Sequence, residues 1–292
     1  MKLYAPKYYS EFKCIADRCR HSCCIGWEID VDPATLNNYS AISHPYGENI
    51  RKSIEDGHFR LADRDRCPHL DGRGLCRIIC ELGEEHLCNI CREHPRFYNY
   101  NSRGCFVGLG LSCEEACRII LGSDSYADFE IIDELDEKIE DLGFDAIGEI
   151  GKIYDILSDR SIGYSERIDK IASAYSLPSA IDPEYRSEIL SSLEYLESEH
   201  ESFFLGALEA SFDLESSDIF ERALAYFVFR HCAAATDRSE FRAALGFAIF
   251  CENLLRALAK NSADVEGTAR IISEELEYSE DNSESIKTEF MF

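Results

Sequence analysis

The stretch Cys14-Ile-Ala-Asp-Arg-Cys19-Arg-His-Ser-Cys23-Cys24 contains four thiols within eleven residues. A second run has the spacing Cys67-x8-Cys76-x3-Cys80-x7-Cys88-x2-Cys91, and it is followed by Cys105, Cys113 and Cys117. In all, 12 of the 14 cysteines fall in the first 117 residues. Glycine, proline and aspartate separate them, so we predict an irregular cysteine-rich region, residues 1–120, that a bound metal holds together.

The cysteines favour metal binding over disulfides. The N-terminal residues lack the apolar segment and cleavage site of a secretory signal, so we expect a cytoplasmic protein. Thiols stay reduced in the cytosol, where a dense cysteine cluster is more often a metal site than a disulfide framework. Thiolate-rich ligation suits either zinc or an iron–sulfur cluster. Ligand chemistry alone leaves both metals open.

The remainder of the chain, residues 121–292, is predicted to be an acidic helical bundle, which makes the fold mainly α. Apolar residues recur at helical intervals in segments 126–157, 193–212, 219–235 and 241–260, and we expect the tail from Glu274 to be frayed or disordered. The net charge of −26 argues against binding to nucleic acid or anionic lipid. Charged residues inside segment 241–259 argue against a membrane span. Cys232 and Cys251 are expected to be core residues.

Compound motifs in the first 120 residues resemble the flagellin lysine-N-methylase (FliB-type) family. They read Phe12-Lys13-Cys14, Cys23-Cys24-Ile-Gly-Trp27-Glu-Ile29-Asp30, Cys67-Pro68-His-Leu70-Asp71-Gly-Arg-Gly74-Leu75-Cys76, Cys91-Arg-Glu-His-Pro95-Arg96 and Leu111-Ser112-Cys113-Glu-Glu115-Ala116. The resemblance implies a methyltransferase that carries a 4Fe-4S cluster. Such an enzyme transfers a methyl group from S-adenosylmethionine to lysine side chains of flagellin or another protein.

Eight cysteines match the family pattern and are the predicted metal ligands: Cys14, Cys19, Cys23, Cys24, Cys67, Cys76, Cys91 and Cys113. One cubane cluster takes four thiolates, so either two metal sites exist or some of these cysteines shield or relay. Cys80 and Cys88 are additional to the pattern and are candidate substitute ligands. The chain also departs from the family at His94 and at Glu114, which stands where the family has proline.

Three further residues are predicted to bind the cofactor. Trp27 could cap a cluster or face a sulfonium by cation–π attraction, with packing as the alternative. Arg77 and Arg96 could donate to cluster sulfurs or bind the donor's carboxylate, with surface ion pairing as the alternative. The glycine fingerprint of a Rossmann methyltransferase is absent, and we predict a turn at Gly108. A second functional hypothesis remains, namely a non-catalytic zinc- or iron-binding module with a structural or docking role.

Overall fold

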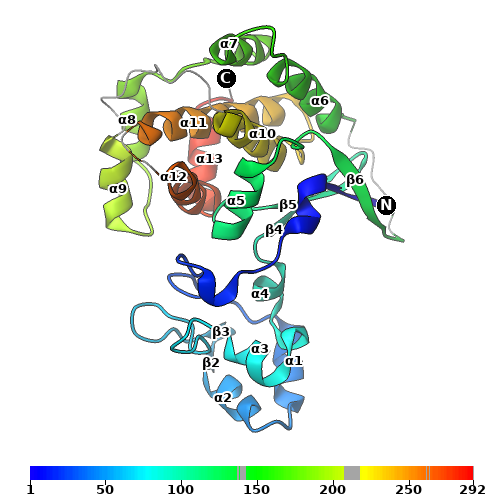
Figure 1. Cartoon of the computed structure of the whole chain (residues 1–292), viewed down its shortest axis with the longest axis vertical. Helices are drawn as coiled ribbons and strands as arrows, with labels where there is room; N and C mark the ends of the chain where they lie inside the picture. The colour runs from blue at the N-terminus through cyan, green and yellow to red at the C-terminus, as the bar shows by residue number, and fades with distance from the viewer. Residues whose placement is uncertain (137, 139–142, 207–217, 261, 263, 292) are drawn as a thin grey trace. The chain divides into compact units, whose positions relative to one another are not determined.

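The computed structural model describes residues 1–136, 138, 143–206, 218–260, 262 and 264–291, and the chain divides into two compact units (Figure 1). The smaller unit comprises Lys13–Arg96 with Cys113–Glu115. The larger unit comprises Met1–Phe12, Phe97–Ser112 and Ala116–Phe292. This division differs from the predicted boundary at residue 120, because residues 97–112 contribute strands to the larger unit. The chain is mainly helical, as predicted.

A four-stranded sheet in the larger unit was not predicted. Its strands are β1 (Lys2–Pro6), β4 (Arg96–Asn101), β5 (Gly104–Leu109) and β6 (Phe129–Glu134), in the order β4-β5-β1-β6. β1 runs parallel to β5 and antiparallel to β6. Because β6 pairs with β1, the helix expected around residues 129–134 is wrong, and pairing between distant segments has overridden the local pattern.

Gly108 lies within β5, so the turn predicted there is also wrong. The strand is buried along its whole length. A Cβ atom at Gly108 would collide with the rings of Phe97 and Phe229. The glycine is therefore required for close packing between the sheet and the helices rather than for a turn.

Helices make up the rest of the larger unit. They are α5 (Glu114–Gly122), α6 (Ala146–Leu157), α7 (Tyr164–Ala174), α8 (Pro183–Ser191), α9 (Ser198–Leu205), α10 (Asp218–Cys232), α11 (Arg238–Ala259), α12 (Val265–Ile272), a π-helical turn (Ser273–Glu277) and α13 (Glu280–Thr288). α10 and α11 pack against each other at the centre of this unit (Figure 1). Across the described ranges, no helix is long and apolar enough to span a bilayer.

The C-terminal segment is ordered, contrary to the prediction of a frayed tail. Leu276 of the π-helical turn and Ile286 of α13 are completely buried. α13 packs against α11, so the acidic segment supplies an apolar face to the core. The predicted helix 193–212 corresponds in part to α9, and its last six residues lie outside the described residues.

Short elements make up the smaller unit. They are α1 (Pro33–Ala41), α2 (Tyr46–Lys52), the β2–β3 hairpin (Ile54–Glu55 and His58–Phe59), α3 (Arg77–Leu82) and α4 (Asn89–Glu93). Its hydrophobic core includes Tyr39, Ile50 and Phe59 together with Cys67 and Cys88. Cysteines thus take core positions that aliphatic residues usually fill.

Asp32 joins two helices of the smaller unit. Its side chain caps α1 by accepting hydrogen bonds from Thr35 N at 3.0 Å and Thr35 Oγ1 at 2.8 Å. It also accepts one from Asn89 N, the first residue of α4, at 3.0 Å. Burial of the carboxylate acts to raise the pKa of Asp32, but the hydrogen bonds from Thr35 and Asn89 outweigh this effect and lower it. One carboxylate therefore fixes the starts of α1 and α4.

Candidate metal centre

The eight predicted ligands all lie in the smaller unit. Cys80 and Cys88 lie there as well, whereas four buried cysteines lie in the larger unit: Cys105, Cys117, Cys232 and Cys251. All 14 cysteines carry reduced thiols. Cys232 and Cys251 are core residues of α10 and α11, which confirms that prediction. The division into units therefore separates the candidate ligands from the core cysteines.

One set of thiols lies in the core of the smaller unit or packs against it, and we name it the closed group: Cys67 and Cys88, which are buried, and Cys76 and Cys91, which are partly buried. Cys24 packs against the same core. Cys67 and Cys88 are only 7% and 1% exposed. Cys76 is the N-cap residue of α3, and Cys88 is the N-cap residue of α4. The Cys91 thiol donates a hydrogen bond to Cys88, which raises the pKa of Cys91 and lowers that of Cys88.

Burial raises the pKa of the Cys67 thiol to about 12, and the neighbouring thiols Cys24, Cys76 and Cys88 add to the rise. These neighbouring thiols raise the pKa of Cys67 because several thiolates close together repel one another. A bound cation would remove this repulsion and favour the thiolate form. The raised pKa of Cys67 therefore indicates that these thiols lie close enough together to bind one cation in common.

A second set lies nearer the surface, and we name it the open group: Cys14, Cys19, Cys23 and Cys113. Cys14 and Cys23 are exposed, while Cys19 and Cys113 are partly buried. Burial raises the pKa of Cys19 to about 11, and both Glu114 and Cys113 contribute to the rise. The hydrogen bond to Cys24 and burial raise the pKa of Cys23, and Cys113 and Cys14 contribute to the same rise. The four thiols are therefore electrostatic neighbours.

Glu114 ties the two segments of the open group together. Its carboxylate accepts hydrogen bonds from Arg20 N at 2.8 Å, from Arg20 Nε at 3.0 Å and from His21 N at 3.3 Å. The Cys19 Sγ lies 3.7 Å from the same carboxylate. Glu114, which stands where the family has proline, thus holds the loop that carries Cys19 beside Cys113.

Cys24 is in contact with both groups. Its carbonyl oxygen accepts a hydrogen bond from Cys67 N at 2.8 Å, and its side chain packs against the core of the smaller unit. Its sulfur accepts a hydrogen bond from the Cys23 thiol, which lowers the pKa of Cys24 to about 7. Cys24 is therefore ionised more readily than an ordinary thiol.

The three side chains predicted to bind the cofactor lie in the smaller unit. Arg77 lies over the Tyr46 ring, 4.4 Å from its centroid, and pairs with Glu81 at 3.2 Å. Arg96 donates to the carbonyl oxygen of Arg92 at 3.2 Å. Trp27 is partly buried. The Arg77 guanidinium is thus already engaged within the protein, and the cofactor role of all three residues stays a prediction.

His69, which lies between Cys67 and Cys76 in sequence, has a structural role. One ring nitrogen is 2.8 Å from the Tyr46 hydroxyl, and the other is 2.9 Å from the Ser53 hydroxyl. Burial lowers the pKa of His69 to about 4, so the ring stays neutral at physiological pH. With both nitrogens hydrogen-bonded, His69 is not placed as a metal ligand.

The donor set fits a thiophilic metal, although the thiols are not arranged as a finished coordination sphere. Within the described ranges, no three His, Cys, Asp or Glu side chains already surround a single point as metal ligands do. The chemistry of the two groups is nevertheless that of zinc or iron–sulfur sites, since thiolate sulfur is the preferred ligand of both.

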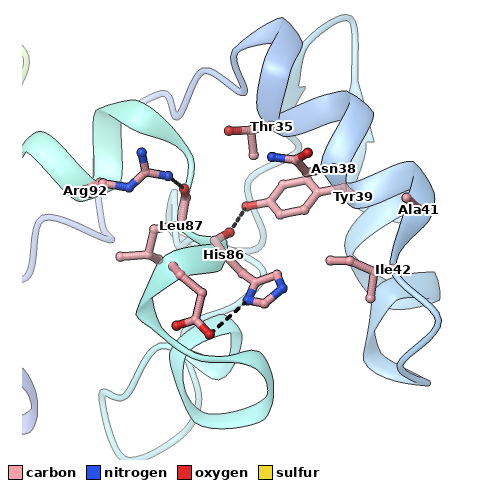
Figure 2. Close-up of a pocket in the computed structure, with 9 residues that line it drawn as sticks. Thr35, Asn38, Tyr39, Ala41, Ile42, His86, Leu87 and Arg92 are labelled. Carbon is pink, nitrogen blue, oxygen red and sulfur yellow. Dashed lines mark hydrogen bonds and ion pairs between the residues drawn. The ribbon is translucent and has the colours of Figure 1, made fainter.

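A polar pocket of about 350 Å³ lies in the smaller unit (Figure 2). Its walls come from α1 and from the chain around His86, and it was not predicted from the sequence. Tyr39 donates to the carbonyl oxygen of His86 at 2.8 Å, and Arg92 donates to that of Leu87 at 2.6 Å. Because both side chains donate to backbone carbonyl oxygens of residues 86–87, they stabilise the loop before α4.

The chain is similar to two proteins named lysine-N-methylase. The relatives, from Salmonella typhimurium and Salmonella choleraesuis, are each 28% identical over 130 residues, which cover 40% of this chain and 31% of the relative. The flagellar biosynthetic protein FliU of Salmonella muenchen is 28% identical over 129 residues, which cover 40% of this chain and 75% of FliU. The resemblance to FliB-type methylases is confirmed.

The matched part of the chain thus spans less than a third of the length of the lysine-N-methylases. No protein-family model matches the chain, and no solved structure matches it.

Proposed function

We propose that the protein is a protein-lysine N-methyltransferase that uses S-adenosylmethionine and a 4Fe-4S cluster, with flagellin or another lysine-bearing protein as substrate. The observation that carries the proposal is the similarity to lysine-N-methylases, together with the gathering of all eight family cysteines in one unit. The acidic chain supports a lysine-bearing partner, because its net charge of −26 attracts cationic surfaces.

The open group is the better candidate for the cluster. A cluster that meets a protein substrate needs an accessible edge, and Cys14 and Cys23 are exposed. Glu114 holds Cys19 beside Cys113 through its bonds to Arg20 and His21. When bound, the cluster would supply electron-transfer or Lewis-acid chemistry next to the donor.

Methyl transfer itself requires a neutral lysine amine in line with the sulfonium of the donor. The amine nitrogen forms a bond to the methyl carbon, the bond from sulfur to that carbon breaks, and the ammonium product releases a proton to solvent. Trp27 is the proposed contact for the sulfonium, and Arg96 the proposed contact for the donor's carboxylate. The Arg77 guanidinium, which lies over Tyr46, is the weaker of the two arginine candidates.

The experiment is a methylation assay with protein purified without oxygen. Flagellin and S-adenosylmethionine are incubated with the protein, and methylated lysines are identified by mass spectrometry. Iron and acid-labile sulfide are measured on the same samples, with about four of each expected per cluster. Cys113→Ser is expected to lose the cluster and the activity, whereas Cys80→Ser, at an exposed cysteine outside the family pattern, serves as the matched control.

Two results would contradict the proposal. One is a wild-type protein that carries zinc without iron or sulfide, which would favour the non-catalytic metal module. The other is an iron-loaded protein that does not bind S-adenosylmethionine, because the methyl donor would then have no site.

A further inference from the structure

β6 is an edge strand of the sheet in the larger unit. It stands at the end of the order β4-β5-β1-β6 and pairs with β1 on one side, and within the described ranges no strand lies beside its other edge. Every residue of the strand after Phe129 is exposed, and Figure 1 shows β6 at the margin of this unit. An open edge of this kind offers backbone N–H and C=O groups to an added strand.

Two neighbouring isoleucines are exposed on this strand. Ile131 is 48% exposed and Ile132 is 39% exposed. The register between β1 and β6 shifts here, because Tyr4 pairs with Ile131 while Leu3 pairs with Asp133. Ile132 is therefore the extra residue of a β-bulge, which breaks the alternation of side chains between the two faces. The edge consequently presents apolar surface as well as backbone groups.

The charge on and around β6 is negative throughout. Segment 124–136 contains six carboxylates and no lysine, arginine or histidine. Asp124 and Asp128, which precede the strand, form ion pairs with Arg222 and Lys7. Across the part of the chain that the structure describes, no ion pair engages the carboxylates of the strand itself, which are Glu130, Asp133 and Glu134.

These carboxylates decide which strand the edge accepts. Edge strands that avoid partners often carry lysine or proline, and β6 carries neither. A second copy of β6 would place carboxylates beside carboxylates, and like charges on adjacent strands destabilise the pairing. A strand rich in lysine would instead place ammonium groups beside carboxylates. Charge therefore favours a cationic strand over a second copy of this chain.

We propose that the β6 edge, Phe129–Glu134, is a docking surface for an extended, lysine-rich segment of the protein substrate, which adds to the sheet as a fifth strand. Backbone hydrogen bonds supply affinity, the two isoleucines contact apolar side chains of the segment, and Glu130 and Asp133 pair with its lysines. The identification of the partner as a substrate rests on the proposed function, whereas the binding of a cationic strand does not.

The test uses the full chain and a labelled eight-residue peptide that alternates lysine and valine, with binding followed by fluorescence anisotropy. The protein is expected to bind the peptide, and salt is expected to weaken binding because it screens exposed charges. A control peptide with N-methylated valines keeps the charge but lacks the backbone donors of the ladder. Its affinity is expected to fall at least roughly tenfold. Equal binding of the two peptides would refute strand addition.

A charge-reversed variant locates the site. Glu130→Lys combined with Asp133→Lys is expected to weaken peptide binding roughly tenfold, because two attractive cross-strand pairs become repulsive. The matched control combines Glu166→Lys with Asp169→Lys, which changes the same residue types at the same spacing on the exposed side of α7. Equal weakening in both variants would assign binding to the overall charge of the chain and overturn the docking surface.

A measurement on the wild-type protein covers the case in which the charge-reversed variant does not fold. When the peptide binds, amides of β6 are expected to gain protection from hydrogen exchange, while those of α7 are unchanged. Protection gained elsewhere but not in β6 would overturn the proposal. Protection of β6 that rises with protein concentration in the absence of peptide would assign the edge to a second copy of the chain.

The methylation assay separates this inference from the proposed function. The charge-reversed variant is expected to raise the KM for flagellin and leave kcat unchanged, since docking is weakened and the chemistry is not. A wild-type protein that binds the peptide but methylates no lysine would refute the methylase proposal and leave the docking surface standing. A charge-reversed variant that methylates flagellin with the wild-type KM would refute the docking of substrate on β6.

Discussion

The cores of the two units are built from different residues. The larger unit buries long helices, and α11 alone has 22 residues, most of which are inaccessible to solvent. In the smaller unit, all of whose residues the structure describes, no helix exceeds nine residues, and thiols occupy core positions. Small cores rarely supply enough hydrophobic stabilisation by themselves. The cysteines of the smaller unit therefore act as core residues, and we expect their contribution to stability to depend on what they bind.

The larger unit instead buries charges that are paired. Glu221 of α10 is 1% exposed and lies 2.6 Å from Arg167 of α7. Glu277 of the π-helical turn receives hydrogen bonds from Tyr226 and His231 of α10. These pairs join helices that are far apart in sequence, and they need no metal. Stability should therefore respond to metal removal in one unit and to charge removal in the other.

Removing the metal is expected to have the largest effect, and only on the smaller unit. A thiolate-bound structural metal supplies on the order of 10 kcal/mol of folding free energy, and we expect the proposed metal of the smaller unit to act in this way. Hydrogen exchange measured by mass spectrometry resolves the two units. Amides of Lys13–Arg96 should lose protection after chelation under reducing conditions, while those of α10 and α11 keep it. Equal loss of amide protection in both units, or no loss in either, would contradict the proposal that a metal supports only the smaller unit.

Breaking a buried ion pair should destabilise the larger unit alone. Glu221→Gln leaves Arg167 buried without its carboxylate, which costs about 3–5 kcal/mol. The control is Glu166→Gln, which removes an exposed pair with Lys170 on α7 and should cost well under about 1 kcal/mol. Chemical denaturation followed by hydrogen exchange gives both values. A Glu221 variant as stable as the control would show that the pair contributes little.

The sequence predicts the structure well where a pattern is local and poorly where distant segments meet. The eight cysteines of the family pattern all lie in one unit, and helical periodicity predicted α10 and α11. The sheet was missed because β1 pairs with β5 and β6, which lie about a hundred residues away in sequence. A register between such segments leaves no periodic signal in either of them.

The candidate site was also only partly predictable. Cys88 was expected only as a candidate substitute ligand because the family pattern lacks it, although it is almost completely buried in the core of the smaller unit. Glu114 was noted only as a departure, and its bonds to Arg20 and His21 became visible in the structure. Charge-rich segments such as the one that contains Glu277 suggested a solvated tail, since sequence does not reveal which carboxylates find a buried partner.

Acid–base behaviour offers a smaller test of the larger unit. Burial raises the pKa of Glu252 to about 7, against the opposing effect of Arg256. The folded state therefore keeps a proton that the unfolded state has lost, so stability falls as pH rises from about 4.5 through 7, by about 3 kcal/mol at most. Glu252→Gln should lose this decline. Free energies of unfolding at several pH values check it, and an unchanged slope in the variant would assign the decline to other groups.

The smallest expected effect concerns Asp32, which distinguishes capping from metal binding as the support of the smaller unit. Asp32→Ala removes the cap of α1 and the acceptor for Asn89 N, and a lost cap costs about 0.5–2 kcal/mol. Asp30→Ala is the matched control, because Asp30 is exposed and pairs with the partly exposed His58. Amides of α1 and α4 should exchange faster in Asp32→Ala only.

Asp32→Asn sharpens the same test. Its amide keeps one acceptor oxygen for Thr35 N, but its NH₂ group cannot accept the bond from Asn89 N. We therefore expect α1 to stay protected while α4, which follows Cys88, exchanges faster. If α4 keeps full protection in both Asp32 variants as long as metal is bound, the thiols alone hold it, and the carboxylate is dispensable at that end of the smaller unit.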